Sequence, residues 1–151
     1  MTAPTVIHDL VERCREGTYP AAVARLHSGW VVLGEQQVLT GYCLLLPDPV
    51  VPHLNALAPV PRAQFLSDMT LIGDALLAVT LGPRINYAIF GNVDPALHAH
   101  VFPRLASEPE ATRRSQPWAL DWNAAPRFSE AAHGDLRDRL RAELNGRLGS
   151  A

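Results

Sequence analysis

Hydrophobic and polar positions change their spacing along the chain, and each spacing predicts a different element of secondary structure. Residues 5–16 repeat apolar side chains at the spacing of an α-helix, and Gly17 follows them as a stop signal. This segment therefore predicts a short amphipathic helix. The side expected to pack carries Val6, Leu10, Arg13 and Cys14.

Several segments in the first third of the chain have the character of strands. Residues 22–27 and 30–33 are rich in β-forming side chains, and Ser28-Gly29 between them is typical of a hairpin connection. The apolar run at 42–47 (YCLLLP) follows Gly41 and ends in a proline-rich loop. A continuous apolar run of this length predicts a strand buried on both faces or nearly so.

The longest periodic segment begins at Pro61 and ends before Gly82-Pro83, and it predicts a long helix with a buried stripe. The stripe comprises Phe65, Met69, Ile72, Leu76 and Val79. Segments 86–90 and 97–102 then predict two strands joined by a turn around GNVDP.

The composition changes after Arg104, and the chain ends in a predicted helix whose N-cap is Ser129 or Asp135. The order helix, strands, helix, strands, helix predicts an α+β fold with helices packed on one face of a sheet. No internal repeat is present, and 151 residues suit one domain spanning 1–151.

Charge and composition exclude several classes of function. The formal net charge of −2 argues against a general nucleic-acid-binding protein, because phosphate contacts need a basic surface. Every basic residue is an arginine, which excludes a Walker-type lysine, Schiff-base catalysis and a lysine general base. The sequence also contains neither GxSxG nor GxGxxG. The remaining nucleophiles are histidine, cysteine and the carboxylates.

Hydropathy and cysteine content indicate the compartment. No apolar run reaches the roughly 20 residues that a membrane span needs. The N-terminal residues lack the basic-then-apolar order of a signal peptide. We therefore expect a soluble, cytoplasmic protein without a membrane partner. Cys14 and Cys43 form no CxxC motif, and we expect reduced, buried thiols at both positions.

Two of the six histidines stand one residue apart in the stretch NVDPALHAHVFPR. On a strand, residues i and i+2 point to the same face, so His98 and His100 are expected to project together. Burying two imidazoles side by side requires partners for four ring nitrogens, which makes a purely structural role costly. Partly exposed histidines on a sheet face nevertheless remain a structural alternative.

This stretch resembles the signature of the histidine triad (HIT) family, His-φ-His-φ-His-φ-φ, often followed by Pro-Arg. Pro103-Arg104 sets the register, so that His98 takes the middle position and His100 the last. NYAIFGN is similar to the strand and turn before the triad, and GYCLLLP to the family's Gly-His strand. The resemblance covers roughly residues 19–104.

The resemblance implies a HIT-like fold in which helices pack on a five-stranded antiparallel sheet, commonly paired into a homodimer. Its core would be about 19–104, with a C-terminal helical extension at about 105–151. It also implies a nucleotide substrate and chemistry at the α-phosphate, without a cofactor. His98 would attack phosphorus to form a transient nucleotidyl-imidazole, and His100 would stabilise charge on the phosphate. The ring nitrogen of His98 that does not attack should donate a hydrogen bond to a backbone carbonyl.

The chain departs from the family pattern at several positions. Ala96 stands in place of the first triad histidine, and Tyr42 in place of the Gly-His histidine. The ribose-binding acid of the family would fall near Gly34, so Glu35 could serve only if the strand register slips by one residue. The resemblance offers Asn86 and Asn92 as candidates for contact with the phosphate, and both also suit ordinary turns or strand ends.

Two other functions remain open from the sequence. The chain could be a nucleotide-binding module that has lost catalysis with its first histidine. His98 and His100 could instead share a Zn²⁺ ion, with Asp94 or His53 completing the site. For an active enzyme, dinucleoside polyphosphates, nucleoside phosphoramidates and adenylylated metabolites are all candidate substrates. Trp118 and Trp122 are expected to pack the C-terminal region onto the sheet, or to close over a base.

Overall fold

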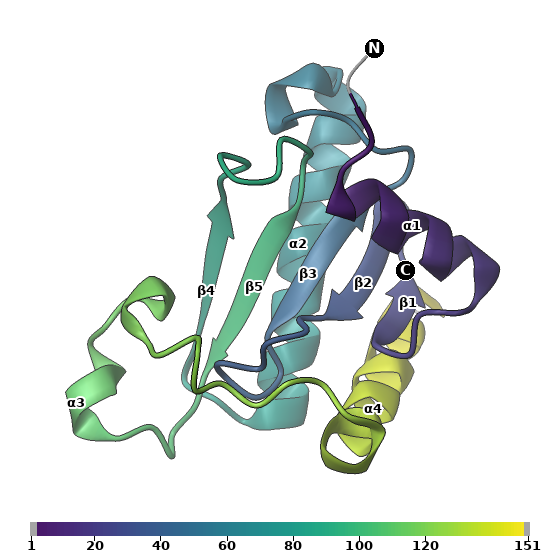
Figure 1. Ribbon diagram of the computed structural model, residues 1–151. Coiled ribbons are helices and arrows are strands. Elements are labelled where there is room, and N and C mark those ends of the chain that lie inside the picture. The colour runs from purple at the N-terminus through teal and green to yellow at the C-terminus, as the bar shows by residue number, and fades with distance from the viewer. Residues whose placement is uncertain (1–2, 150–151) are drawn as a thin grey trace.

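The computed structural model describes residues 3–149 and is built on one antiparallel sheet of five strands in the order β1-β2-β3-β5-β4 (Figure 1). The strands are β1 (Ala22–Arg25), β2 (Gly29–Leu33), β3 (Cys43–Pro47), β4 (Arg84–Ile89) and β5 (Ala99–Arg104). The helices are α1 (Val6–Glu16), α2 (Pro59–Thr80), α3 (Glu110–Arg113) and α4 (Glu130–Gly149). Short 3-10 turns at Leu54–Ala56 and Pro117–Ala119 complete the fold. This α+β architecture confirms the predicted sheet, its covering helices and the C-terminal helix.

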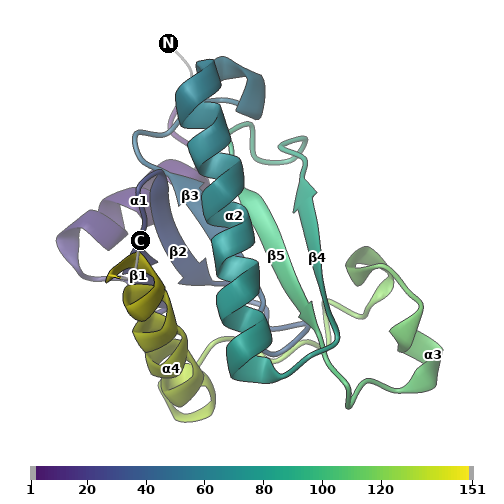
Figure 2. The same cartoon turned by 180° about the vertical axis from the view of Figure 1, so that it is seen from behind.

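Helices α2 and α4 lie side by side over one face of the sheet (Figure 2). Alternate residues of the central strands, such as Val31, Leu45 and Val101, point into this layer and are fully buried. Phe65 of α2 and Leu140 of α4 meet them there, also with no exposed surface. This layer is the main core, because burial of apolar surface is the dominant favourable contribution to folding.

The opposite face of the sheet is covered in part by α1, so the prediction that the helices share one face is wrong. Val32 and Leu46 point away from α2 and pack with Ile7 and Val11 of α1. Strand β3 is therefore buried on both faces, as its continuous apolar run predicts.

Helix α1 has the predicted ends but packs through a different side. Thr5 caps its N-terminus by accepting from the Ile7 amide, and Gly17 ends it in the left-handed region at φ 72°. The buried residues are Ile7, Val11 and Cys14, whereas Val6 is 67 % exposed. A shift of one position turns a helix face by about 100°, which accounts for the difference.

The other boundaries move by one or two residues. β1 ends at Arg25 and Gly29 already belongs to β2, while α2 starts at Pro59. β4 starts at Arg84, two residues early, and β5 starts at Ala99, two residues late. His98 therefore lies just before β5 rather than within it.

The segment between β5 and α4 crosses the sheet on the face opposite α2 (Figure 1). It forms an isolated β-bridge between Gln36 and Arg127, and the Phe128 amide donates to the Glu35 carbonyl. Ser129 then caps α4 by accepting from the Ala132 amide, which selects Ser129 over Asp135 as the start signal. The C-terminal region is thus tied to the sheet through backbone as well as side chains.

None of the helices within residues 3–149 has both the length and the hydropathy that a membrane span requires. Cys14 and Cys43 are both buried free thiols, as predicted. Burial raises the pKa of Cys14 to about 11, and that of Cys43 still further, which keeps both thiols protonated.

Candidate functional site

The two histidines meet on the sheet face opposite α2. Ala99 and Val101 point into the main core, so the positions that alternate with them point the other way. The rings of His98 and His100 lie with their centroids 4.9 Å apart and their planes at 71°. The expectation that the pair projects together is confirmed.

His98 has one ring nitrogen engaged by the backbone. Its Nδ1 lies 2.8 Å from the carbonyl oxygen of Ala96. Because a carbonyl only accepts, Nδ1 must carry the proton and donate it. In the neutral ring, Nε2 then holds the free lone pair, as expected for an imidazole that can act as a nucleophile or base.

His100 is held by Tyr42, whose Oη lies 2.6 Å from His100 Nδ1. The buried Tyr42 hydroxyl has no other hydrogen-bond partner among residues 3–149. If Nδ1 donated, the hydroxyl hydrogen would therefore stay buried and unpaired. Tyr42 thus donates, and the proton of neutral His100 resides on Nε2, where it is a donor.

Glycine at position 34 makes room for this arrangement. A Cβ placed there would stand 2.4 Å from two ring carbons of Tyr42, closer than any real contact. The Tyr42 ring also stacks on Phe102, with centroids 4.3 Å apart. The hydroxyl that faces His100 is therefore positioned by packing on two sides.

His100 remains neutral well below physiological pH. Its burial, together with the neighbouring His98, lowers its pKa from 6.5 to about 4. Burial also raises the pKa of Tyr42, so the hydroxyl stays protonated. The pair consequently offers an N–H donor rather than a cation near pH 7.

Aromatic side chains enclose the space above the histidines. A cavity of about 500 Å³, here called the histidine cavity, is lined by Tyr42, Phe90 to Asp94, His98, His100, Trp118 and Trp122. Trp118 stands edge-on to His100 with ring centroids 5.0 Å apart, and Trp122 stands edge-on to Tyr42. Flat rings on several sides suit a planar group that stacks.

The histidine cavity has little charge. Among the described residues that line it, none is an arginine, and Asp94 is the sole carboxylate. One Asp94 oxygen, Oδ1, is buried without a hydrogen-bond partner within residues 3–149. Contact with an anion in this cavity therefore depends on His100 Nε2–H, on the side-chain amide of Asn92 and on backbone amides.

The structure brings some of the predicted site residues together and separates others. Asn92 lines the histidine cavity. Asn86 lies on β4 opposite Phe102, and its Oδ1 accepts from Arg104 in a neighbouring cavity.

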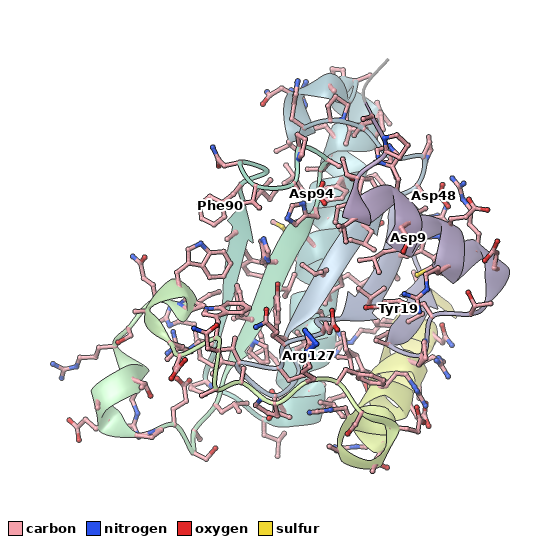
Figure 3. The ribbon with its side chains drawn as sticks, in the orientation of Figure 1. Asp9, Tyr19, Asp48, Phe90, Asp94 and Arg127 are labelled. Carbon is pink, nitrogen blue, oxygen red and sulfur yellow. The ribbon has the colours of Figure 1, made fainter. Side chains whose placement is uncertain are left out.

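Glu35 does not line the histidine cavity. Its carboxylate is exposed and pairs with Arg127 at 3.4 Å. Arg127 lies toward the opposite end of the sheet from Phe90 and Asp94 (Figure 3).

A metal site is not assembled around the histidine pair. Across residues 3–149, no three His, Cys, Asp or Glu side chains are grouped so that they could hold a metal ion. His53 lines a separate cavity of about 250 Å³ together with Ala96 and His98, and it is exposed. The third ligand that a zinc site needs is thus not brought to His98 and His100.

Phe90 is a site residue that the sequence reasoning missed. Its ring is 57 % exposed and faces Trp118 with centroids 5.4 Å apart. A phenylalanine at the end of the predicted strand 86–90, directly before Gly91 and its turn, was the available signal.

Known structures resemble this arrangement of elements closely, whereas no family model and no curated protein matches the sequence. A histidine triad protein from Bradyrhizobium japonicum superimposes with a TM-score of 0.69 at 21 % identity, over 87 % of this chain and 94 % of that one. The chain has the histidine triad fold. This confirms, at the level of the fold, the resemblance that the sequence suggests.

Two further histidine triad structures support the same assignment. A HIT-like protein from Bartonella henselae, described as involved in cell-cycle regulation, gives a TM-score of 0.72 at 14 % identity, over 95 % of this chain and 98 % of that one. A hypothetical histidine triad nucleotide-binding protein from Sulfolobus tokodaii gives a TM-score of 0.71 at 13 % identity, over 91 % of this chain and 92 % of that one. The histidine triad fold therefore spans nearly the whole chain, including most of the C-terminal extension.

Proposed function

We propose that this chain is a nucleotide hydrolase or nucleotidyl transferase that acts at the α-phosphate through His98. The observation that carries the proposal is the hydrogen bond from His98 Nδ1 to the Ala96 carbonyl, which leaves the Nε2 lone pair free beside His100. The likeness to nucleotide-binding proteins of the same fold supports it.

In the first step, His98 Nε2 forms a bond to phosphorus while the bond from phosphorus to the leaving group breaks. The leaving group takes a proton from water or from the medium. The imidazole becomes positively charged, and the Ala96 carbonyl stabilises that charge through Nδ1–H. His100 Nε2–H donates to the phosphate oxygen on which charge develops.

In the second step, water attacks phosphorus and the P–N bond breaks. The products are a nucleoside monophosphate and neutral His98, and an alcohol or amine in place of water gives transfer instead. The positive charge on the phosphorylated ring makes it a good leaving group. Dinucleoside polyphosphates and nucleoside phosphoramidates both fit this scheme.

Trapping the covalent intermediate tests the proposal most directly. Wild type is mixed with each substrate class and quenched in base, and mass spectrometry of peptides then locates a nucleotidyl group. We expect the adduct on His98, mononucleotide release by wild type, and neither in His98→Ala. His27→Ala is the matched control, because His27 is exposed and lies outside the cavity. Turnover by His98→Ala equal to that of wild type would contradict the proposal.

The alternative function is a nucleotide-binding module without catalysis. The aromatic lining of the histidine cavity, without an arginine among its described residues, favours this alternative. It predicts saturable nucleotide binding by calorimetry with no product and no adduct. The trapping experiment distinguishes the two, because only an enzyme gives both adduct and release.

We also propose that two copies pair into a homodimer through β4. At the other edge of the sheet, Arg141 of α4 donates to the β1 carbonyls of Ala22 and Val23, which blocks that edge. β4 is the remaining edge strand and carries the exposed side chain of Tyr87. Open edges favour pairing with another strand. Analytical ultracentrifugation should give twice the chain mass, and a monomer at all concentrations would refute the dimer.

A further inference from the structure

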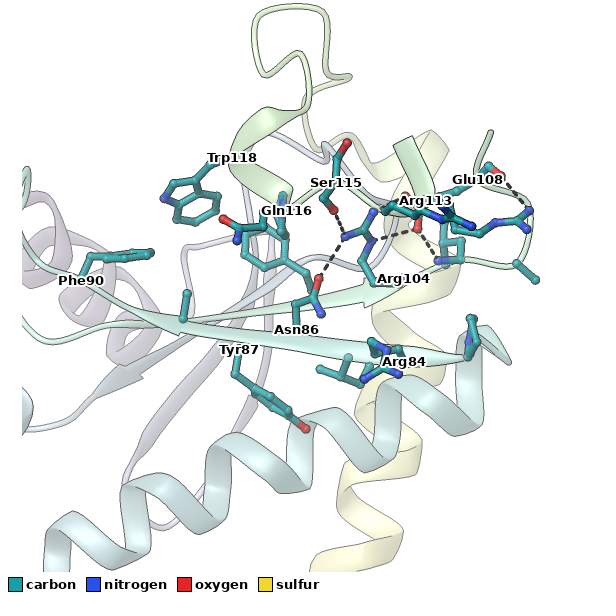
Figure 4. A pocket seen from close by; sticks show the side chains of 18 residues that line it. Arg84, Asn86, Tyr87, Phe90, Arg104, Glu108, Arg113, Ser115, Gln116 and Trp118 are labelled. Atoms are coloured by element: carbon teal, nitrogen blue, oxygen red, sulfur yellow. Dashed lines mark hydrogen bonds and ion pairs between the residues drawn. The ribbon is translucent and has the colours of Figure 1, made fainter. Parts of the chain in front are cut away.

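A second cavity lies beside the histidine cavity. It has a volume of about 1020 Å³ and lies between β4 and the segment 104–118 that carries α3 (Figure 4). Phe90 and Trp118 line both cavities, so the two spaces meet at this pair of rings. A ligand held at the histidines could thus extend past Trp118 without leaving the protein surface.

The second cavity, here called the arginine cavity, has a different charge from its neighbour. Glu108 is the one carboxylate among the described residues that line it. The lining also contains four arginines, Arg84, Arg104, Arg113 and Arg114. Arg104 is buried and donates to both oxygens of Glu108, at 2.7 and 3.0 Å. The pair is neutral as a whole, and it anchors the segment around α3 to the sheet through the Ser115 and Thr112 carbonyls.

The other three arginines form no ion pair within residues 3–149. Within residues 3–149, the side chains of Arg84 and Arg114 make no hydrogen bond, ion pair or cation–π contact. Arg113 donates only to the Glu108 carbonyl, at 3.3 Å. Three unpaired positive charges around one hollow are a marked local departure in a chain of net charge −2. Such a concentration attracts anions and is weakened by salt.

The contrast between the two cavities indicates what each accepts. The histidine cavity offers rings and two imidazoles, and so has room for one phosphate and a planar group. Additional negative charges would be poorly solvated among those rings. The arginine cavity is the better environment for them, because guanidinium groups can form charge-assisted hydrogen bonds with phosphate oxygens.

We propose that the arginine cavity binds the leaving group of the reaction, and that this group carries at least one phosphate beyond the bond that breaks. The inference rests on the proposed function for its orientation, because the reacting phosphate is taken to lie at His98. The arginine cavity therefore favours substrates whose leaving group carries phosphate over phosphoramidates, whose leaving group is an uncharged amine. Arg84, Arg113 and Arg114 are the residues that determine this preference.

The binding test uses inorganic tripolyphosphate as the probe, measured by calorimetry at low and high salt. The proteins are wild type, the triple variant Arg84→Gln/Arg113→Gln/Arg114→Gln, and His98→Ala. We expect the triple variant to bind about tenfold more weakly or worse, because it lacks three charged donors. His98→Ala should bind like wild type. Arg139→Gln is the control, since Arg139 is an exposed arginine on α4, on the other face of the sheet.

The outcomes separate this inference from the proposed function. No tripolyphosphate binding by wild type, equal binding by the triple variant, or equal weakening in Arg139→Gln each overturns the anion site. Binding that depends on the three arginines, in a protein that turns over no substrate, supports the site and refutes the hydrolase. If turnover is seen, the triple variant should lose kcat/KM for polyphosphate-bearing substrates and keep it for phosphoramidates. Equal losses for both substrate classes overturn the inference.

Discussion

Tyr42 Oη lies 2.6 Å from His100 Nδ1 and is the only hydrogen-bond partner of that nitrogen among the residues that the structure describes. The contact joins positions that are 58 residues apart in the sequence. It fixes both the orientation and the tautomer of His100, and thereby presents Nε2–H to the histidine cavity.

Tyr42→Phe should slow the reaction while leaving the fold intact. Without the hydroxyl, His100 loses a hydrogen bond of about 1 kcal/mol and populates both tautomers, so we expect kcat to fall roughly five- to tenfold. Nitrogen chemical shifts of His100 measured by NMR should change from a single tautomer to a mixture. Tyr19→Phe removes a hydroxyl that makes no hydrogen bond to the residues the structure describes, and it should change neither. Unchanged shifts in Tyr42→Phe would show that the tyrosine does not set the tautomer.

His100 should also make the stability depend on pH. Its pKa is about 4 in the folded chain against an ordinary 6.5, so the unfolded chain binds the proton first as pH falls. The free energy of unfolding is therefore highest above pH 6.5 and decreases toward pH 4, by at most about 1.4 kcal/mol per pH unit. Urea unfolding of wild type and His100→Gln should differ in slope within this window. Parallel slopes would mean that His100 is not desolvated.

The sequence predicted those elements and site residues that a short local pattern is sufficient to identify. The spacing of His98 and His100 put both rings on one face because strand geometry alternates from residue to residue. The long stripe of α2 and the apolar run of β3 likewise identified their elements, because burial leaves a local signature. These patterns predicted the sheet, its long helix and the histidine pair.

Other features depend on packing between distant segments and have no local pattern. The face of α1 was assigned one residue away because Val6 and Ile7 are equally apolar, and only contact with Leu46 decides between them. The partnership of Tyr42 with His100 requires the pairing of β3 with β5. The role of Trp118 depends on the path of the C-terminal segment, which the sequence does not specify.

The buried pair of Arg104 and Glu108 should be far more important for stability than a surface pair. Glu108→Gln leaves the buried guanidinium without its counter-charge, and we expect a loss of about 3–5 kcal/mol in the free energy of unfolding. Glu12→Gln breaks the exposed pair with Arg15, where the cost should be about 0–1 kcal/mol. Urea titration of both variants gives the comparison. Similar losses of unfolding free energy in the two variants would show that the pair of Arg104 and Glu108 is open to solvent.

Substitution of Trp118 should mainly affect ligand binding and substitution of Trp122 mainly stability, although the two residues lie only four positions apart. Trp122 donates from Nε1 to the Pro117 carbonyl and packs against Tyr42 and Phe102, so Trp122→Ala should cost about 2 kcal/mol or more. Trp118 is 45 % exposed at the mouth of the histidine cavity, so Trp118→Ala should change stability by less.

For ligand binding the order should reverse. A base stacked on Trp118 contributes about 1–3 kcal/mol, so Trp118→Ala should weaken nucleotide affinity roughly tenfold. Nucleotide should quench the fluorescence of wild type and of Trp122→Phe, because Trp118 remains as the reporter. In Trp118→Phe the quenching should be lost. Quenching that persists there would move the base away from Trp118, toward Trp122 or Trp30, and would place the ligand outside the junction of the two cavities.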